Sequence, residues 1–269
     1  MPESEMIYDI RTSEKAKKTL VNITGVPLPI WQEYSKREGE YEYPEDLVEA
    51  VVDQFGKWPG TYEKFQFICT HITTSANKCT SFVQNGILDL PNSYLCEDSE
   101  LRQFLEEHGV FIDLQKAELQ YHDKTINICY CPASERKPGE YNSWLIARKF
   151  YYDFAVCGFL SVSEWDVYEG KVHRRPEILK DIDQLLNTKL SQEWNRTHKA
   201  YEIVAQVCGE NIVYDGDDED DERKKVLSYL TSAYNTAFGS PSEKILLMKN
   251  DVCIPKNDIL LIKPLQCWK

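Results

Sequence analysis

Hydrophobic and polar positions alternate most regularly between residues 65 and 71, which predicts a strand with two distinct faces. One face carries Phe65, Phe67, Cys69 and His71. After two threonines, Ser75 is suited to cap a short helix and Gly86 is suited to end it. The apolar side of that helix carries Cys79, Phe82 and Val83. A histidine and two threonines are therefore expected together where a strand gives way to a helix, a position suited to holding a ligand.

The first 60 residues are expected to form a helical N-terminal extension. Thr12 or Ser13 is suited to cap a short basic helix. Pro44 suits the first turn of a second helix, whose apolar positions recur at helical spacing until Gly56. The predicted boundaries are residues 1–60 for the extension and residues 61–269 for the main domain.

Beyond residue 90 the pattern mixes helices and strands without regular alternation, which favours the α+β class. Helices are predicted over residues 99–108, 142–153, 176–187 and 192–207, and after the acidic run as far as Phe238. Strands are predicted over residues 110–114, 119–131, 155–162, 211–214, 243–248 and 258–262. The last two strands are expected to be joined by a turn that contains Pro255.

Composition narrows the class of protein. Of the 269 residues, 42% are hydrophobic, and no run approaches the ~18 apolar residues that a membrane helix needs. The N-terminus lacks a basic stretch followed by an apolar one, so no secretory signal is predicted. Nine cysteines, an odd number, do not indicate a disulfide framework. Reduced thiols and a cytoplasmic location are therefore expected.

The net charge of −13 argues against broad contact with a nucleic-acid backbone, and a partner with a basic surface fits it better. The acidic run over residues 215–222 is interpreted as a solvated loop or, alternatively, a docking segment. Cys129 and Cys131 lack a second pair of ligands, so no metal is expected. No glycine-rich phosphate loop of the Rossmann or Walker type is present either.

Two stretches resemble motifs of the ADP-ribosyltransferases. In that family a strand carries a His followed by a Thr, and a Gly-[Ile/Leu]-Leu segment follows the next short helix. Here Thr70-His-Ile-Thr-Thr74 precedes the helix and Gly86-Ile-Leu-Asp-Leu90 follows it. Glu243-Lys-Ile-Leu-Leu resembles the third motif, in which a glutamate opens a late strand. The chain is most similar to the toxin-like branch that includes the DNA-targeting ADP-ribosyltransferases of toxin–antitoxin pairs.

The resemblance implies a mixed β core flanked by helices, and the transfer of ADP-ribose from NAD to a protein or nucleic-acid acceptor. It implies that Glu243 acts on the reacting ribose and the acceptor, and that His71 hydrogen-bonds the adenosine-side ribose. The further NAD contacts that it implies are hydroxyls at Thr73 and Thr74, a nicotinamide-stacking ring at Tyr94 or Tyr168, and a diphosphate-binding arginine at Arg102 or Arg174. A toxin or phage-defence role, with an antitoxin or regulatory protein as partner, is the biological expectation.

Structural interpretations remain open for the same residues. His71 also fits a hydrogen-bonded histidine at the margin of the core, and Glu243 an exposed residue at a strand start. Arg102 can pair with Glu106 one helical turn later. The middle motif of the family remains open between Tyr94, Tyr168 and the segment 158–162. Two other functions remain as alternatives: hydrolysis of NAD with water as acceptor, or a non-catalytic protein that keeps the fold to bind a partner.

Overall fold

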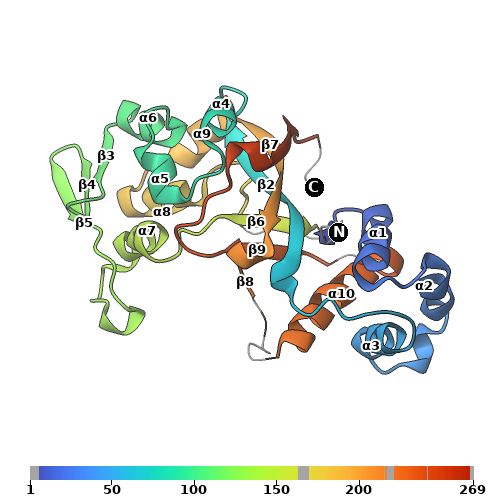
Figure 1. Cartoon of the computed structure of the whole chain (residues 1–269). Coiled ribbons are helices and arrows are strands. Elements are labelled where there is room, and N and C mark those ends of the chain that lie inside the picture. Colours follow the sequence, from blue (N-terminus) through green and yellow to red (C-terminus); the bar gives the residue numbers. More distant parts are fainter. Residues whose placement is uncertain (1–5, 163–169, 215, 217–220, 241, 267–269) are drawn as a thin grey trace.

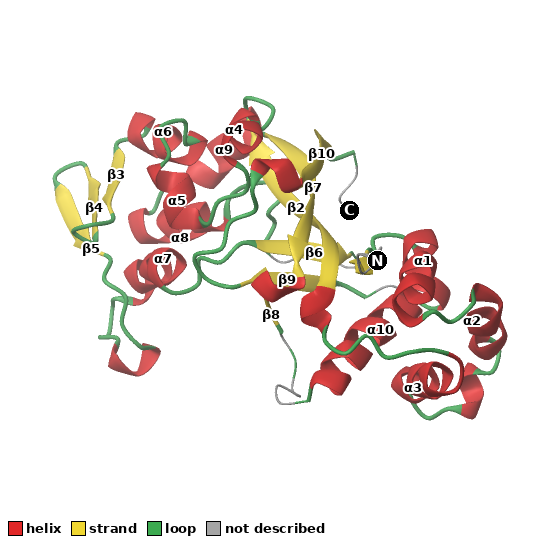
Figure 2. Ribbon diagram, viewed as in Figure 1, coloured by secondary structure: helices red, strands yellow, loops and turns green. Residues whose placement is uncertain are grey.

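The computed structural model describes residues 6–162, 170–214, 216, 221–240 and 242–266. As the sequence predicts, it is a mixed α+β structure, with a largely antiparallel main sheet (Figure 2). The strands of that sheet are β1 (Met6–Tyr8), β2 (Phe65–Ser75), β6 (Cys157–Ser161), β7 (Lys199–Cys208), β8 (Ile212–Val213), β9 (Lys244–Met248) and β10 (Ile259–Pro264). Their order is β10-β7-β2-β6-β9-β8, and β1 pairs in parallel with the start of β2.

The central strand, β2, has the two faces that the sequence predicts. Phe65, Phe67 and Cys69 are buried in one hydrophobic core, and His71 continues the same face beyond it. β7 pairs with β2 from Gln66 to Ser75, so the strand is held along almost its whole length. The predicted ligand-binding segment is therefore a rigid part of the sheet.

Four helices pack on one side of the main sheet (Figure 1). They are α1 (Ser13–Thr24), α2 (Leu28–Ser35), α3 (Pro44–Phe55) and α10 (Glu222–Phe238). Tyr8 of β1 donates a hydrogen bond of 2.8 Å to the carbonyl of Tyr229 in α10, and both rings are buried. The N-terminal segment thus shares one core with the sheet, and the boundary at residue 60 stays a prediction.

A second group of elements lies on the other side of the main sheet and has its own core (Figure 1). Its helices are α5 (Leu90–Leu95), α6 (Glu100–Glu107), α7 (Tyr141–Tyr151), α8 (Glu177–Leu186) and α9 (Leu190–Thr197), and the short α4 (Thr80–Asn85) precedes them. A small antiparallel sheet completes it with β3 (Val110–Asp113), β4 (Glu118–Tyr121) and β5 (Lys124–Asn127). In the described part of the chain, no helix is both long and apolar enough to cross a membrane.

Local capping explains several boundaries. The Thr12 hydroxyl accepts a hydrogen bond from the Lys15 amide at the start of α1, and Ser99 caps α6 in the same way. Pro44 opens α3 and Gly56 ends it, both as predicted. Each of these positions satisfies or avoids a backbone group that the end of a helix leaves unpaired.

One predicted helix is wrong in its second half. The helix expected over residues 192–207 ends at Thr197, and the chain continues as β7. Tyr201, Ile203 and Val207 lie on one face of this strand and enter the first core. A period of two and several β-branched side chains favour a strand, and this pattern outweighs the helical spacing that ends at Trp194.

Two further expectations need correction. Ser75 is the last residue of β2 rather than a helix cap, and Cys79 precedes α4 with φ +62°. Ser75 still organises the turn, since its hydroxyl oxygen accepts hydrogen bonds from the amides of Asn77 and Cys79. Pro255 lies in the connection between the two late strands, as predicted, and β7, β2 and β6 lie between β9 and β10 in the sheet.

Candidate functional site

A cavity opens where β2 and β6 separate. β2 stays paired with β7 as far as Ser75, but its only partner pair with β6 is Thr70 with Phe159. Beyond Thr70 the two strands diverge, and side chains from β2 face the gap. The cavity at this point has a volume of about 390 Å³. That volume falls in the range of about 300–1,000 Å³ typical of small-molecule sites.

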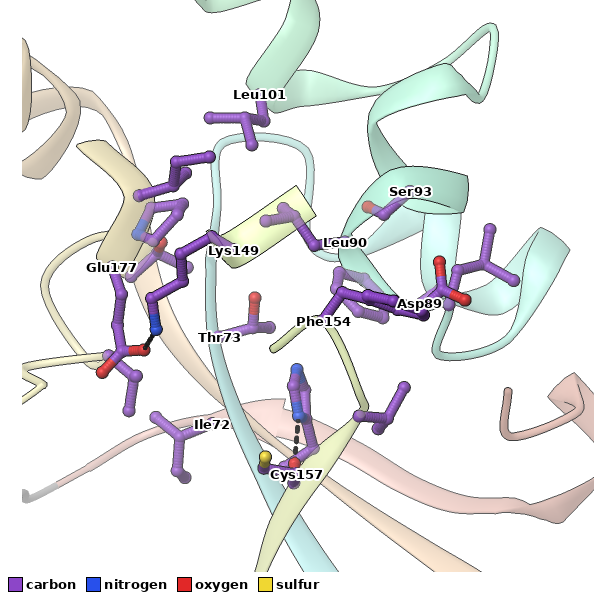
Figure 3. A pocket seen from close by; sticks show the side chains of 18 of the residues that line it. Ile72, Thr73, Asp89, Leu90, Ser93, Leu101, Lys149, Phe154, Cys157 and Glu177 are labelled. Carbon is purple, nitrogen blue, oxygen red and sulfur yellow. Dashed lines mark hydrogen bonds and ion pairs between the residues drawn. The ribbon is translucent and has the colours of Figure 1, made fainter. Parts of the chain in front are cut away.

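Both halves of the first sequence motif line this cavity. His71 and Thr73 contribute from the end of β2, and Gly86, Leu88 and Asp89 contribute from the segment after α4. Ile87 of that segment forms a bridge with Ile254, with two backbone hydrogen bonds of 2.9 Å. The bridge fixes the second half of the motif beside the first. Figure 3 shows Thr73 and Asp89 among the residues that surround the cavity.

His71 is held in one tautomer. Its Nδ1 lies 2.9 Å from the carbonyl oxygen of Cys157 at the start of β6. Because a carbonyl oxygen only accepts, Nδ1 carries the hydrogen. Nε2 of the neutral ring is then an acceptor, and no described residue donates a hydrogen bond to it. Burial lowers the pKa of His71, against the opposing effect of its bond to the Cys157 carbonyl. At neutral pH the ring is therefore uncharged and suited to accept a hydrogen bond from a hydroxyl group.

The two threonines of the motif play different parts. Thr73 lies half-buried in the cavity wall and offers a hydroxyl. Thr74 is buried, and its hydroxyl oxygen accepts a hydrogen bond of 2.8 Å from the indole nitrogen of Trp194 in α9. Both residues contribute to the lining, but Thr74 also ties β2 to the second group of helices.

A polar network supports the wall behind the threonines. Glu100 accepts hydrogen bonds of 2.7 Å from the Ser75 hydroxyl and from the Ala76 amide. His198 lies 3.5 Å from the same carboxylate, and its ring stacks on Trp194 with centroids 3.5 Å apart. Burial, more than any other effect, lowers the pKa of His198. The network joins α6, α9 and the end of β2 into one supporting wall.

Charged side chains of both signs line the remaining wall. Lys149 of α7 lies 2.7 Å from Glu177, the first residue of α8, and both face the cavity (Figure 3). Arg175 also lines it, and its Nη1 donates to the carbonyl of Gly170 at 3.2 Å. Asp153 contributes a second carboxylate on this side. The cavity can thus receive a ligand that carries anionic groups, hydroxyls and an apolar ring.

Glu243 is not among the residues that line the cavity. It directly precedes β9, and Ile245, two residues later, does line it. Ile245 pairs with Phe159, which pairs with Thr70. Because β9 runs parallel to β2, Glu243 lies on the side of Thr70 away from His71, two strands and about 10 Å across the sheet from β2. Glu243 itself is half-buried.

The structure places the other predicted contacts outside the cavity or outside the described residues. The Tyr94 ring is buried in the second core, and its hydroxyl oxygen accepts from the Ile112 amide. Arg102 donates to the carbonyls of Leu95 and Glu97 on the surface of α6. Arg174 is exposed, whereas its neighbour Arg175 lines the cavity. Tyr168 lies outside the described residues.

Three residues that line the site, Lys149, Glu177 and Trp194, have no clear signal in the sequence. Lys149 and Glu177 meet because α7 packs against α8, and nothing in their local sequence marks that pairing. Trp194 reaches Thr74 across 120 positions of the chain. Asp89 could have been predicted from the sequence, because it lies in the motif segment 86–90 and its side chain accepts from the Asn92 amide to cap α5. Within the described ranges, no group of three or more His, Cys, Asp and Glu side chains could hold a metal ion.

Comparisons with models of protein families, with curated proteins and with solved structures find no significant match to this chain.

Proposed function

We propose that the chain binds NAD in the cavity between β2 and β6 and transfers its ADP-ribose group to a macromolecular acceptor. The observation that supports this most is that both halves of the first motif, separated by a helix in the sequence, line one cavity. His71 offers a neutral acceptor there, and Thr73 offers a hydroxyl. These groups match the hydroxyls of a ribose.

The lining also suits the other parts of NAD. Phe154 and Phe82 contribute aromatic surface for a planar ring, and Lys149 and Arg175 contribute positive charge for a diphosphate. Glu243 is the carboxylate that the resemblance assigns to the reacting ribose and the acceptor. Glu243 directly precedes β9, the strand whose Ile245 lines the cavity. The toxin or phage-defence role and an antitoxin partner belong to the same proposal.

Labelled NAD tests the proposal directly. The purified chain is incubated with NAD labelled on its adenylate phosphate, alone and with a cell lysate, beside His71→Ala and Glu243→Ala. We expect label on protein or nucleic acid with the unaltered chain, and loss of that label with His71→Ala. Free ADP-ribose without labelled macromolecules would instead indicate NAD hydrolysis. Absence of any NAD binding by calorimetry would rule out both reactions and favour a non-catalytic binding protein.

Growth measurements test the biological part. Induced synthesis of the unaltered chain is expected to slow the growth of a bacterial host, and His71→Ala is expected to relieve that effect at equal protein level. If the host grows normally although the chain consumes NAD, the toxin role is contradicted, and the proposed reaction with NAD still stands.

A further inference from the structure

Four aromatic rings stack on one another in the second group of elements. They come from α7, from the residue that follows it and from the segment that precedes it, and they are Tyr130, Tyr141, Trp144 and Tyr152. The Tyr130 ring stacks on Tyr152 and on Trp144, with centroids 4.9 Å and 6.3 Å apart. Trp144 also stacks on Tyr141, with centroids 6.3 Å apart. These four rings are called the aromatic ladder below.

The aromatic ladder lies at the surface and carries unused hydrogen-bond donors. Tyr141 is 52% exposed and Tyr152 is 58% exposed, and the other two rings are half-buried. Trp144 Nε1 donates a hydrogen bond of 2.7 Å to the Cys131 carbonyl, which fixes this ring in place. The hydroxyl groups of Tyr130, Tyr141 and Tyr152 have no hydrogen-bond partner among the described residues, and none of the three is enclosed. Exposed ring surface of this extent is typical of an interaction site.

Two cations lie at one end of the aromatic ladder. The guanidinium carbon of Arg136 lies 4.7 Å from the ring centroid of Tyr141 and 5.2 Å from that of Trp144. Among the described residues, neither Arg136 nor Lys137 forms an ion pair. The nearby Glu140 carboxylate accepts from the backbone amide of Lys137 instead. Both positive charges are therefore available to a partner that carries carboxylates.

The aromatic ladder adjoins the wall of the cavity. The guanidinium carbon of Arg148 lies 6.0 Å from the Trp144 ring centroid, and the same side chain lies 3.1 Å from the Asp153 carboxylate. Asp153 directly follows Tyr152 in the chain and lines the cavity. A partner bound to the ladder therefore lies beside the opening between β2 and β6.

We infer that the aromatic ladder is the docking surface for a proline-rich segment of a partner protein, with acidic residues beside its prolines. Such segments adopt the polyproline II helix, which has no internal hydrogen bonds and leaves its carbonyl groups open. Surfaces lined by aromatic rings recognise this helix. The three tyrosine hydroxyls supply donors for the carbonyls, and Arg136 and Lys137 supply charge for the acidic residues. The inference does not depend on the proposed reaction with NAD.

A single-stranded nucleic acid fits the aromatic ladder less well. Its bases stack on open ring faces, whereas Tyr130 and Trp144 each stack against two neighbouring rings. A polyanion also needs a basic surface, and the net charge of −13 opposes its approach. A proline-rich segment carries few charges, and because its helix is already formed it loses little conformational entropy on docking.

Calorimetry of the full chain with synthetic probes tests the inference. The probes are decaproline, decaproline with glutamates added at each end, a glycine–serine peptide of equal length and a thymidine decamer. We expect saturable binding of both proline peptides, tighter for the one with glutamates, and no binding of the glycine–serine peptide. Failure of both proline peptides to bind at millimolar concentration would overturn the inference. Binding of the thymidine decamer in their place would assign the ladder to nucleic acid.

Substitutions on the exposed rings locate the binding site. Tyr152→Ala is expected to weaken decaproline binding by at least about fivefold, since tyrosines are frequent among the residues that contribute most to binding. Tyr152→Phe removes only the hydroxyl and is expected to weaken it by up to about fivefold, the effect of one hydrogen bond. Tyr43→Ala, at an equally exposed tyrosine before α3, is the control and should leave binding unchanged.

Lys137→Gln tests the charge of the partner. It is expected to reduce the advantage of the glutamate-containing peptide and to leave the binding of decaproline unchanged. Circular dichroism shows whether each variant is folded. An equal effect of Tyr152→Ala and Tyr43→Ala would overturn the assignment of the site to the ladder. An undiminished preference for glutamates in Lys137→Gln would overturn the role of this cation.

Discussion

The indole Nε1 of Trp194 donates a hydrogen bond of 2.8 Å to the hydroxyl oxygen of Thr74, and both groups are buried. Trp194 belongs to the second core and Thr74 to the end of the central strand. The bond therefore joins the two parts of the fold at the wall of the cavity. The His198 ring, stacked on the indole, covers the same junction.

Removing this hydrogen bond is expected to destabilise the chain. Trp194→Phe keeps an aromatic ring but removes the indole N–H donor. The buried hydroxyl oxygen of Thr74 is then left without this hydrogen bond. We expect a loss of about 1–3 kcal/mol for the lost bond, added to the cost of the smaller ring. Urea denaturation followed by circular dichroism measures the total.

Trp31→Phe is the matched control. Trp31 is also fully buried, but its Nε1 has no hydrogen-bond partner among the described residues. The ring loses the same atoms in both variants, but Trp31→Phe also removes a buried donor that lacks a partner, so the difference between the two losses combines the bond to Thr74 with this relief. Equal losses for the two substitutions would show that the Trp194–Thr74 contact contributes nothing beyond packing.

A second prediction concerns Gly86, in the motif segment that lines the cavity. Its φ is +85°, and a Cβ there would lie only 2.2 Å from the carbonyl oxygen of Ile254. Gly86→Ala must therefore push the two segments apart and disturb the Ile87–Ile254 bridge. We expect about 1–3 kcal/mol of destabilisation from the clash, beyond the conformational strain, again measured by urea denaturation.

Gly60→Ala serves to separate the cost of the clash at Gly86 from the cost of the backbone strain. Gly60 has a similar φ of +89°, and nothing lies within 4 Å of its would-be Cβ. Its substitution is expected to cost only the left-handed strain, about 1–2 kcal/mol. A loss at Gly86 no greater than that at Gly60 would mean that the segments at the bridge separate without cost.

The sequence was informative about local features of the fold. Period-two alternation identified β2, and Pro44 and Gly56 marked the ends of α3. β7 could also have been recognised, because β-branched residues are frequent over residues 203–207 and Tyr201, Ile203 and Val207 lie on one face of a strand, but this stretch was included in the predicted helix of residues 192–207. Pairing order is harder to infer, since β9 and β10 follow each other in the chain and are separated by three strands.

The residues of the site could be predicted from the sequence only where they lie in one continuous segment of the chain. His71 and Thr73 follow from the strand pattern and lie in the cavity. Lys149 and Glu177 come from two helices whose packing depends on the whole second core, and no local pattern records that contact. The same limit applies to Glu243, whose distance from His71 depends on the register of three strands.

A third prediction concerns His108 and its contact with Glu193. The imidazole Nε2 lies 2.8 Å from the Glu193 carboxylate, and Nδ1 contacts the Phe104 carbonyl. Burial opposes the charged ring, but these two contacts together raise the pKa of His108. The stabilisation is therefore complete below the unfolded pKa of about 6.5 and is lost as pH rises through the higher folded value.

Glu193→Gln is accordingly expected to destabilise the chain by about 0.2–1 kcal/mol at pH 5.5 and by almost nothing at pH 9. The small magnitude reflects the exposure of the Glu193 side chain. Urea denaturation at the two pH values measures it. Glu106→Gln, which removes a surface contact of 3.9 Å with Arg102, is the control and should show no such dependence. A loss at pH 9 equal to that at pH 5.5 would contradict the role of His108.

The last prediction follows from the neutral ring of His71. Burial lowers its pKa, so the unfolded chain binds a proton at a higher pH than the folded chain does. Stability is then unaffected by this group above about pH 6.5 and falls as pH drops below that value. His71→Asn places an amide nitrogen near the Nδ1 position, which can still donate to the Cys157 carbonyl, and removes the titrating group. Between pH 6.5 and pH 5 we therefore expect the free energy of unfolding to fall less in His71→Asn than in the unaltered chain.

The same variant tests what Nε2 does for a ligand, because asparagine has no acceptor at that position. His71→Asn is expected to weaken NAD binding at neutral pH by about fivefold or more, the effect of losing one hydrogen bond of about 1 kcal/mol. Protonation of Nε2 removes the same acceptor, so NAD affinity of the unaltered chain should fall in acid while that of His71→Asn stays flat. His122→Asn, at an exposed turn of the small sheet, is the control for both measurements. If affinity falls equally in acid with and without the imidazole, another group is responsible for the pH dependence and His71 does not contact the ligand through Nε2.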